Sequence, residues 1–285
     1  MEANNFIPCI IISYTSICTF IAISMTTELV LLDKLYNIWD RKRRKSILRR
    51  YSNYLNEKIG NFPNTKIFIK RIRDEDERVE IIIEGEDEVF VSNIIQNEIG
   101  IVRDFDDLKE GETYLGKIVD VGEVGFGIFV DCGIVNPRSE VLINLHTLRE
   151  QLVSNKEVSV RDIIKAYDLI DHFPLYVKLN KLDHQNHDLL GSLDEISLNL
   201  FGKLLRENLE GIFFGGETKG QIKKALVSEG HLRDIASIER YGFLENIVIL
   251  REGTEAPGII SKIGKHLKGC DVSAIRPKRI KQLRA

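Results

Sequence analysis

Apolar residues and glycines alternate in one central stretch of the chain, residues 116–133. The pattern predicts two β-strands that are joined by a glycine turn. Gly127 lies inside the second strand, where a glycine marks a bulge or a close approach by a ligand. We expect a bulge there that turns Phe126 and Phe129 toward one surface. Two aromatic rings on an open sheet face form a platform on which a nucleobase can stack.

Two further regions, before and after this stretch, each mix helical and strand patterns. Before it, residues 28–32, 66–70 and 78–84 have strand patterns, and residues 40–60 and 89–99 have apolar positions at helical spacing. These elements predict a small α+β unit with a sheet covered on one side. After it, a second α+β unit is predicted from the following segments: helices over about 194–208, 218–228 and from Pro257, a hairpin of 235–241 and 244–250 turned at Gly242, and a strand over 272–275.

The run from Phe126 to Gly133 resembles the signature of the S-one-type RNA-binding domain, a small OB-type barrel named after a ribosomal small-subunit protein. Residues 141–148, 175–183 and 189–193 resemble its third, fourth and fifth strands. The match covers about residues 110–195, with a helical insert near residues 159–169 between the third and fourth strands. Ser159 is a candidate N-cap of that helix, with Asp162 in the capping-box position. The alternative is that both phenylalanines are buried in the core of an unrelated hairpin.

The resemblance implies which residues contact RNA. They are the aromatics Phe126 and Phe129, Asn144 in the third strand, and Asp183 and His187 near the fourth turn. The family commonly has His where Asn144 stands and Arg where His187 stands, so this chain lacks a permanent positive charge at both positions. Phosphate attraction supplies most non-specific affinity, and other cations must therefore contribute.

The charges are unevenly distributed, although the formal net charge is only −3. Residues 25–60 and 251–285 each carry nine Lys or Arg against four and three Asp or Glu, whereas residues 74–112 carry three against fifteen. Basic patches attract a polyanion whatever the net charge is. The predicted additional RNA contacts are Lys117, Arg43, Arg44, Arg49, Arg50, Arg276, Lys278 and Arg279. The alternative for the basic helix is a solvated face with no ligand.

Residues 1–24 contain an uncharged, apolar stretch. Ser and Thr dilute it and it lacks the basic region of a signal peptide. We expect a cytoplasmic protein whose functional start is Met25, with an over-extended leader. The alternative is a membrane anchor over residues 6–26, because length alone permits a span.

Recognisable catalytic and metal-binding motifs are missing from the sequence. It has no nucleophile elbow, phosphate loop, dinucleotide fingerprint or paired-carboxylate signature. The four cysteines are far apart in sequence, which argues against a zinc ribbon or a disulfide framework. The segment from Asp183 to Asp188 could be taken as a metal cluster, but a loop with two histidines gives a weak ligand set. We therefore predict no cofactor, no metal site and no enzymatic activity.

The segment from Glu255 to Leu267 resembles the start of the ligand-sensing ACT module, because Pro257 and Gly258 precede an apolar helical stripe. A helix N-terminus with free amides can hold an anion, although proline at the first helical position is also ordinary helix chemistry. A ligand-sensing regulator is therefore the alternative function.

The whole chain after residue 25 resembles an archaeal domain-of-unknown-function family, number 2110, with a central S-one-type domain. The stretches that carry the resemblance are 126–133, 142–152, 170–174 and 253–280. We predict an α+β multidomain protein: a leader (1–24), an N-terminal α+β domain (25–107), an OB-type barrel with a helical insert (108–195) and a C-terminal, ACT-like α+β domain (196–285). The resemblance implies RNA binding, and we expect a non-catalytic factor that serves translation or ribosomal RNA. The sequence does not indicate an oligomeric state.

Overall fold

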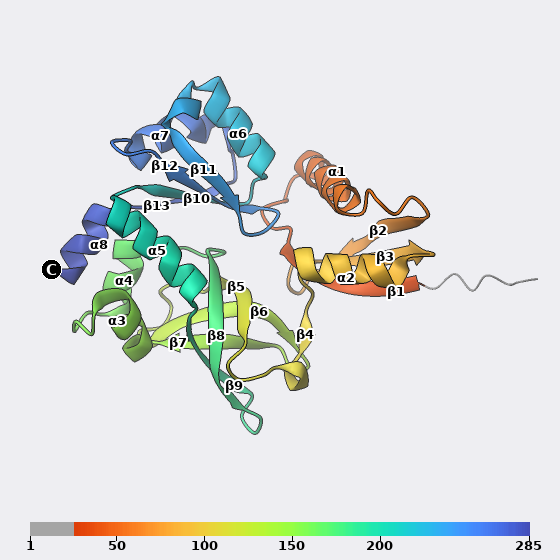
Figure 1. The fold of residues 1–285 in the computed structure, drawn as a ribbon, viewed down its shortest axis with the longest axis horizontal. Coiled ribbons are helices and arrows are strands. Elements are labelled where there is room, and N and C mark those ends of the chain that lie inside the picture. The colour runs from red at the N-terminus through yellow and green to blue at the C-terminus, as the bar shows by residue number, and fades with distance from the viewer. Residues whose placement is uncertain (1–25) are drawn as a thin grey trace, which may run out of the picture.

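The computed structural model describes residues 26–285, so the predictions for the leader lie outside the described residues. Three sheets follow one another along the chain (Figure 1). We call the parts built on them the N-terminal unit (residues 26–98), the barrel (residues 103–193) and the C-terminal unit (residues 195–284). In Figure 1 the N-terminal unit lies at the right, the barrel below and the C-terminal unit above. The fold is thus mixed α+β with a closed β-barrel in the middle.

The N-terminal unit is a three-stranded antiparallel sheet in the order β1-β3-β2, packed with two helices. Helix α1 buries Ile47, Tyr51 and Leu55, which recur every four residues and so form one stripe. Asp40 caps this helix, because its carboxylate accepts the backbone N–H groups of Lys42 and Arg43. The predicted strands and helices of this unit are confirmed with these bounds: β1 Thr26–Lys34, α1 Arg41–Lys58, β2 Thr65–Ile72, β3 Arg78–Gly85 and α2 Glu88–Glu98.

The barrel is closed by five strands. Strand β5 pairs with β6 and β8, β6 pairs with β7, and β8 pairs with β9, all antiparallel. A parallel pairing of β7 with β9 closes the circle. The short strand β4 adds to the outside of β6. The bounds are β4 Arg103–Asp104, β5 Thr113–Val119, β6 Gly127–Val135, β7 Ser139–Asn144, β8 Pro174–Asp183 and β9 Asp188–Leu193.

A helical insert lies between β7 and β8, as predicted, but it is longer than expected. It contains α3 (Leu145–Val153) as well as α4 (Val160–Tyr167). The prediction of a third strand over residues 141–148 is wrong in its second half, because Asn144 ends the strand and caps α3 by accepting the N–H of Thr147. The predicted capping box of Ser159 and Asp162 is confirmed at α4.

The C-terminal unit begins with α5, and its sheet has the order β11-β12-β10-β13 with all neighbours antiparallel. The chain order β10-α6-β11-β12-α7-β13 is that of a split βαβ arrangement. Helices α6 and α7 cover one face, and α5 packs on the other face toward the barrel. The bounds are α5 Glu195–Glu207, β10 Gly211–Gly215, α6 Lys219–Ser228, β11 Ile235–Arg240, β12 Glu245–Leu250, α7 Ala256–Ile263, β13 Asp271–Ile275 and α8 Pro277–Arg284.

Two elements of the C-terminal unit differ from the predictions. Strand β10 was not expected, since its five residues are buried on both faces and so show no alternation. No element was predicted after residue 275, and the segment from Pro277 forms α8. Ile280 of that helix is buried, and Arg284 donates to the carbonyl of Leu152 and to the Tyr167 hydroxyl.

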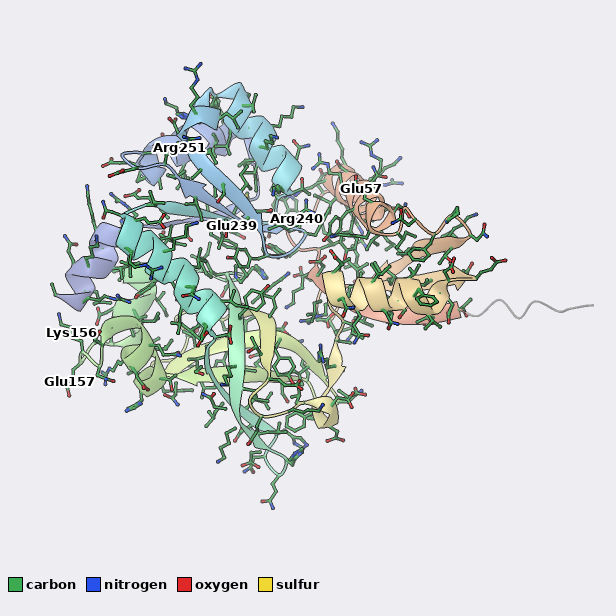
Figure 2. The ribbon with its side chains drawn as sticks, viewed as in Figure 1. Glu57, Lys156, Glu157, Glu239, Arg240 and Arg251 are labelled. Atoms are coloured by element: carbon green, nitrogen blue, oxygen red, sulfur yellow. The ribbon has the colours of Figure 1, made fainter. Side chains whose placement is uncertain are left out.

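The three units meet at a junction that is packed by aromatic residues and buried charges. Phe173 of the barrel lies 5.0 Å from Phe213 of the C-terminal sheet, measured between ring centroids. The turn between β11 and β12 inserts Phe243 into the core of the N-terminal unit, where its ring lies edge-on to Tyr51. Arg240, which Figure 2 labels on β11, stacks on the ring of Tyr54. The N-terminal unit is therefore fixed to the rest of the protein through side chains of α1.

Candidate nucleic-acid interface

Phe126 and Phe129 share one surface of the barrel, and their rings meet edge-to-face with centroids 6.1 Å apart. Phe126 is 55 % exposed and Phe129 is half-buried, so Phe126 is not a core residue. The predicted bulge at Gly127 is wrong, because residues 127–130 pair with β7 in unbroken register. Phe126 reaches the surface of Phe129 because it lies just before the strand. Gly127 instead allows the backbone of β7 to lie close to β6, since a Cβ at this position would lie 2.4 Å from the carbonyl oxygen of Ile143.

A hollow of about 790 Å³ opens beside the two rings, between β6, β7 and the turn that joins β8 to β9. Asp183 and His187, predicted from distant parts of the sequence, line it together with both phenylalanines. Its cations are Arg138, Lys181 and His187 when protonated, and its carboxylates are Glu140, Asp183 and Asp188. The hollow therefore combines an aromatic wall with polar groups but has no surplus of permanent positive charge.

The carboxylate of Asp183 shapes the turn that borders the hollow. It accepts backbone N–H groups from Asn186 and Gln185, and these hydrogen bonds lower the pKa of Asp183 below its usual value. His187 is exposed, and its ring lies edge-on to Phe105 at 5.1 Å between centroids. Asn144 lies opposite Gly127 in the ladder, at the edge of the same face, with its side-chain oxygen engaged in capping α3.

Lys117 was predicted to contact RNA, and the structure places it elsewhere. It is buried at the junction, where its Nζ lies 2.7 Å from Oε1 of Glu245. Burial raises the pKa of Glu245, and the positive charge of Lys117 opposes that rise. A partner 128 residues away in sequence thus holds this lysine inside the protein.

A second buried cluster at the junction surrounds Asp131, two residues after Phe129 in β6. Its two carboxylate oxygens lie 2.8 Å from Nη2 of Arg78 and 2.5 Å from Nζ of Lys34, both from the N-terminal unit. Burial raises the pKa of Asp131, but Arg78 and Lys34 outweigh this and lower it well below its usual value. Nearby, burial followed by the charges of Lys117 and Lys34 lowers the pKa of His172 to about 4.

The predicted basic residues of α1 fall into two classes. Arg43 donates to the carbonyls of Asn37, Lys268 and Gly216, and Arg50 bonds Glu217. These two arginines therefore hold the helix against the C-terminal unit. Arg44 and Arg49 are exposed, and neither has an ion-pair partner within residues 26–285.

The predicted basic residues near the end of the chain are partly engaged. Arg276 bonds Glu210 at 3.1 Å, and exposed Lys278 and Arg279 lie 4.0 and 3.9 Å from carboxylates. Glu210 also accepts the backbone N–H of Ala256 at 2.7 Å. The first turn of α7, where the alternative hypothesis places a ligand anion, thus already contacts a carboxylate of the protein.

A metal-binding cluster and a membrane-spanning helix are absent from the described part of the chain, residues 26–285. No group of three or more His, Cys, Asp and Glu residues there could hold a metal ion. None of the helices in that part has the length and apolar character needed to cross a membrane.

Sequence reasoning missed three residues that bear on this interface. Arg138 and Lys181 line the hollow. The alternation of β8 would have placed Lys181 on the buried side with Leu179, but the register shifts between these two residues and Lys181 is exposed. Trp39 is 70 % exposed beside the basic helix. The sequence pattern that could have indicated Trp39 as a surface residue is its position directly before a helix cap and a run of cations.

Comparisons with known proteins identify two matching family models. Residues 108–198 match the DUF2110 central domain, and residues 210–275 match the DUF2110 C-terminal domain. Among solved structures, the intact alpha subunit of aIF2 from Pyrococcus abyssi is similar over 59 % of this chain and 97 % of that one, with 10 % sequence identity and a TM-score of 0.23. A TM-score this low carries no argument about fold or function. No curated protein sequence matches the chain.

Proposed function

The chain belongs to the DUF2110 family, and we propose that it is a non-catalytic protein that binds single-stranded RNA through its central barrel. The observation that carries the proposal is the exposed ring of Phe126 beside Phe129, on a face that also bears the turn of Asp183 and His187. Base stacking on such rings contributes about 1–3 kcal/mol per base and tolerates any sequence.

The topology of the barrel supports the choice of this face. Its strands in chain order, β5 to β9, are paired 1-2-3-5-4 around the circle, which fits an OB-type barrel. OB-type barrels bind oligonucleotides on strands 2 and 3 and on the loops that join strands 1–2 and 4–5. In this chain those parts are β6, β7 and the two turns at residues 120–126 and 184–187. The hollow beside Phe126 lies on them.

In the proposed complex the side chains have different tasks. Phe126 and Phe129 stack on bases, while Asp183 and His187 offer hydrogen bonds at the edges of the hollow. Asn144 lies outside the hollow and offers its amide N–H groups, because its side-chain oxygen caps α3. Lys181 and Arg138 line the same hollow as the rings and are the cations that we assign to phosphates there. Because carboxylates offset them, we assign the bulk of the phosphate attraction to exposed cations elsewhere, first of all Arg44 and Arg49.

We extend the proposal to ribosomal RNA or the translation machinery as the target and to the cytoplasm as the location. This extension rests on the resemblance of residues 126–133 to the S-one-type domain. We do not propose ligand sensing by the C-terminal unit, because Glu210 contacts the helix terminus that would bind the ligand.

Crosslinking of the native protein to RNA tests the proposal directly. Ultraviolet irradiation followed by peptide mass spectrometry should attach RNA to the peptides that contain Phe126, Phe129 or His187. Sequencing of the attached RNA should give a ribosomal RNA peak. A purified protein that carries no RNA and crosslinks to none would contradict the proposal.

A further inference from the structure

Trp39 is the only tryptophan of the chain, and it stands in the turn between β1 and α1. At 70 % exposure it is the most exposed large hydrophobic residue in the described part of the chain. A single exposed aromatic residue is not evidence of a binding site by itself. An indole ring that stays in water adds little to the stability of the fold, so its surroundings indicate what it could bind.

The ring of Trp39 is held in place. It lies on the backbone of Gly269, where an added Cβ would come within 2.3 Å of the ring, so only glycine fits there. The guanidinium of Arg43 lies 5.7 Å from the ring centroid, and its own hydrogen bonds to three carbonyls fix it. A preorganised ring loses little entropy when a ligand binds.

Cations surround the ring and the hollow of about 370 Å³ beside it. Lys42 and Lys268 are exposed and have no carboxylate partner within residues 26–285. The two carboxylates that line the hollow are already engaged, since Asp40 caps α1 and Glu217 pairs with Arg43 and Arg50. With four cations (Lys42, Arg43, Arg50 and Lys268) against these two carboxylates, the lining of the hollow has a positive excess charge.

We propose that this hollow is a second base-stacking site for single-stranded RNA, with a base on Trp39 and the flanking phosphates at Lys42 and Lys268. The Trp39 site depends on the proposed function only because that function identifies single-stranded RNA as the ligand. A protein partner fits less well, because the apolar core that such interfaces need is reduced here to Trp39 and Ile47 among cations. An aromatic ring with cations around it is the composition of a single-strand binding site.

The intrinsic tryptophan fluorescence of the protein reports on this site alone, because Trp39 is its only tryptophan. Titration of the full chain with a short oligouridylate should quench the indole emission, since a stacked base quenches it. The double variant Phe126→Ala/Phe129→Ala should still show this quenching, although with weaker overall binding. Titration of this double variant distinguishes the failure of the Trp39 site from the failure of the barrel platform.

Substitution provides the second readout. Trp39→Ala should lower the affinity for a labelled oligouridylate about tenfold, as expected for the removal of one stacked base. Phe90→Ala is the matched control, because Phe90 is also strongly exposed, at 66 %, and lies on α2 outside the hollow. Lys42→Gln combined with Lys268→Gln should weaken the quenching at low salt and have less effect at high salt.

The proposal is overturned if RNA binds the protein without changing the indole emission, or if Trp39→Ala binds RNA as tightly as Phe90→Ala. It is also overturned if Trp39→Ala leaves RNA affinity unchanged but abolishes self-association in light scattering. That last result would assign the surface to protein contacts.

Discussion

Strand β6 serves two regions of opposite character, the open face at Phe129 and the sealed junction at Asp131. The open face has a half-exposed ring, a wide hollow and mixed charges that keep contact with water. At the junction, Asp131 is 5 % exposed and holds two cations from another unit. Two residues of one signature therefore have different surroundings: Phe129 lies at the proposed ligand face, and Asp131 joins the units. Perturbation of the junction should change stability, and perturbation of the open face should change binding.

The largest effect is expected at the junction. Asp131→Asn leaves Lys34 and Arg78 buried without their anion, and the removal of one partner from a buried ion pair costs about 3–5 kcal/mol. Urea denaturation should show this decrease in the free energy of unfolding. The control Glu28→Gln removes the exposed partner of Lys70 and should cost about 1 kcal/mol or less. Equal decreases in both variants would mean that the junction is not a special point of stability.

A pH dependence should also arise from the junction. His172 has a folded pKa of about 4, so between about pH 4 and 6.5 the unfolded chain binds a proton that the folded protein does not. Stability therefore decreases as the pH falls through this window, by roughly 2 kcal/mol between pH 7 and pH 5. Asp131 adds little to the change between pH 7 and pH 5, because its carboxyl is ionised there in both the folded and the unfolded state, and its stabilisation is lost only at lower pH.

The variant His172→Asn tests this origin. Asparagine tolerates the positive φ of 64° at this position better than most residues do. Urea midpoints at pH 7 and pH 5 should differ less in the variant than in the parent protein. An identical decline in both proteins would assign the acid sensitivity to other groups.

The open face should respond in the opposite way. Replacing Phe126 and Phe129 by alanine should weaken RNA binding by about 2 kcal/mol or more, because the bases no longer stack on the rings. Stability should fall less than in Asp131→Asn, because Phe126 is exposed and Phe129 is only half-buried. Fluorescence anisotropy with a labelled oligonucleotide gives the affinity, and Phe68→Ala, a half-exposed aromatic on β2, is the control. Unchanged affinity in a folded double variant would remove the platform from the proposal.

The smallest effect concerns the two classes of arginine on α1. Arg44→Gln with Arg49→Gln should flatten the slope of log affinity against log salt by about 0.7 for each phosphate that the variant no longer neutralises. Arg43→Gln with Arg50→Gln should lower the stability instead and leave the slope unchanged, since Glu217 and backbone carbonyls engage these residues. A slope that stays the same in the first pair would make α1 a solvated face.

Local patterns in the sequence predicted most of the fold. Helix α1 and the insert helix α4 could be predicted because caps and apolar stripes act within a few residues. Strand β10 could not, since burial on both faces removes the alternation, and neither could α8, whose burial depends on distant packing partners. The end of β7 at Asn144 depended on a cap that the strand pattern concealed.

The candidate site was predictable where one strand and one turn bring its residues together. Of the five residues that the resemblance implied, four line one hollow (Phe126, Phe129, Asp183 and His187), whereas Asn144 does not. The sequence placed Lys117 at the RNA face, whereas it is buried against Glu245 of another unit. No local pattern in the sequence indicates such a pairing. Arg43 and Arg44 are neighbours with identical chemistry, and only the tertiary contacts of Arg43 distinguish them.

If both proposed sites bind RNA, the insertion of Phe243 into the N-terminal core makes the affinity depend on the length of the strand. Because this contact and the hydrogen bond from the backbone N–H of Phe243 to the Asp33 carboxylate fix the N-terminal unit, the barrel face and the Trp39 hollow keep one separation. Two sites on a flexible tether would gain affinity gradually as the strand grew. Two sites on a rigid body gain nothing until the strand spans them, and then gain at once. The shortest RNA that binds both sites at once would thus be set by the distance that the packing of Phe243 fixes between them.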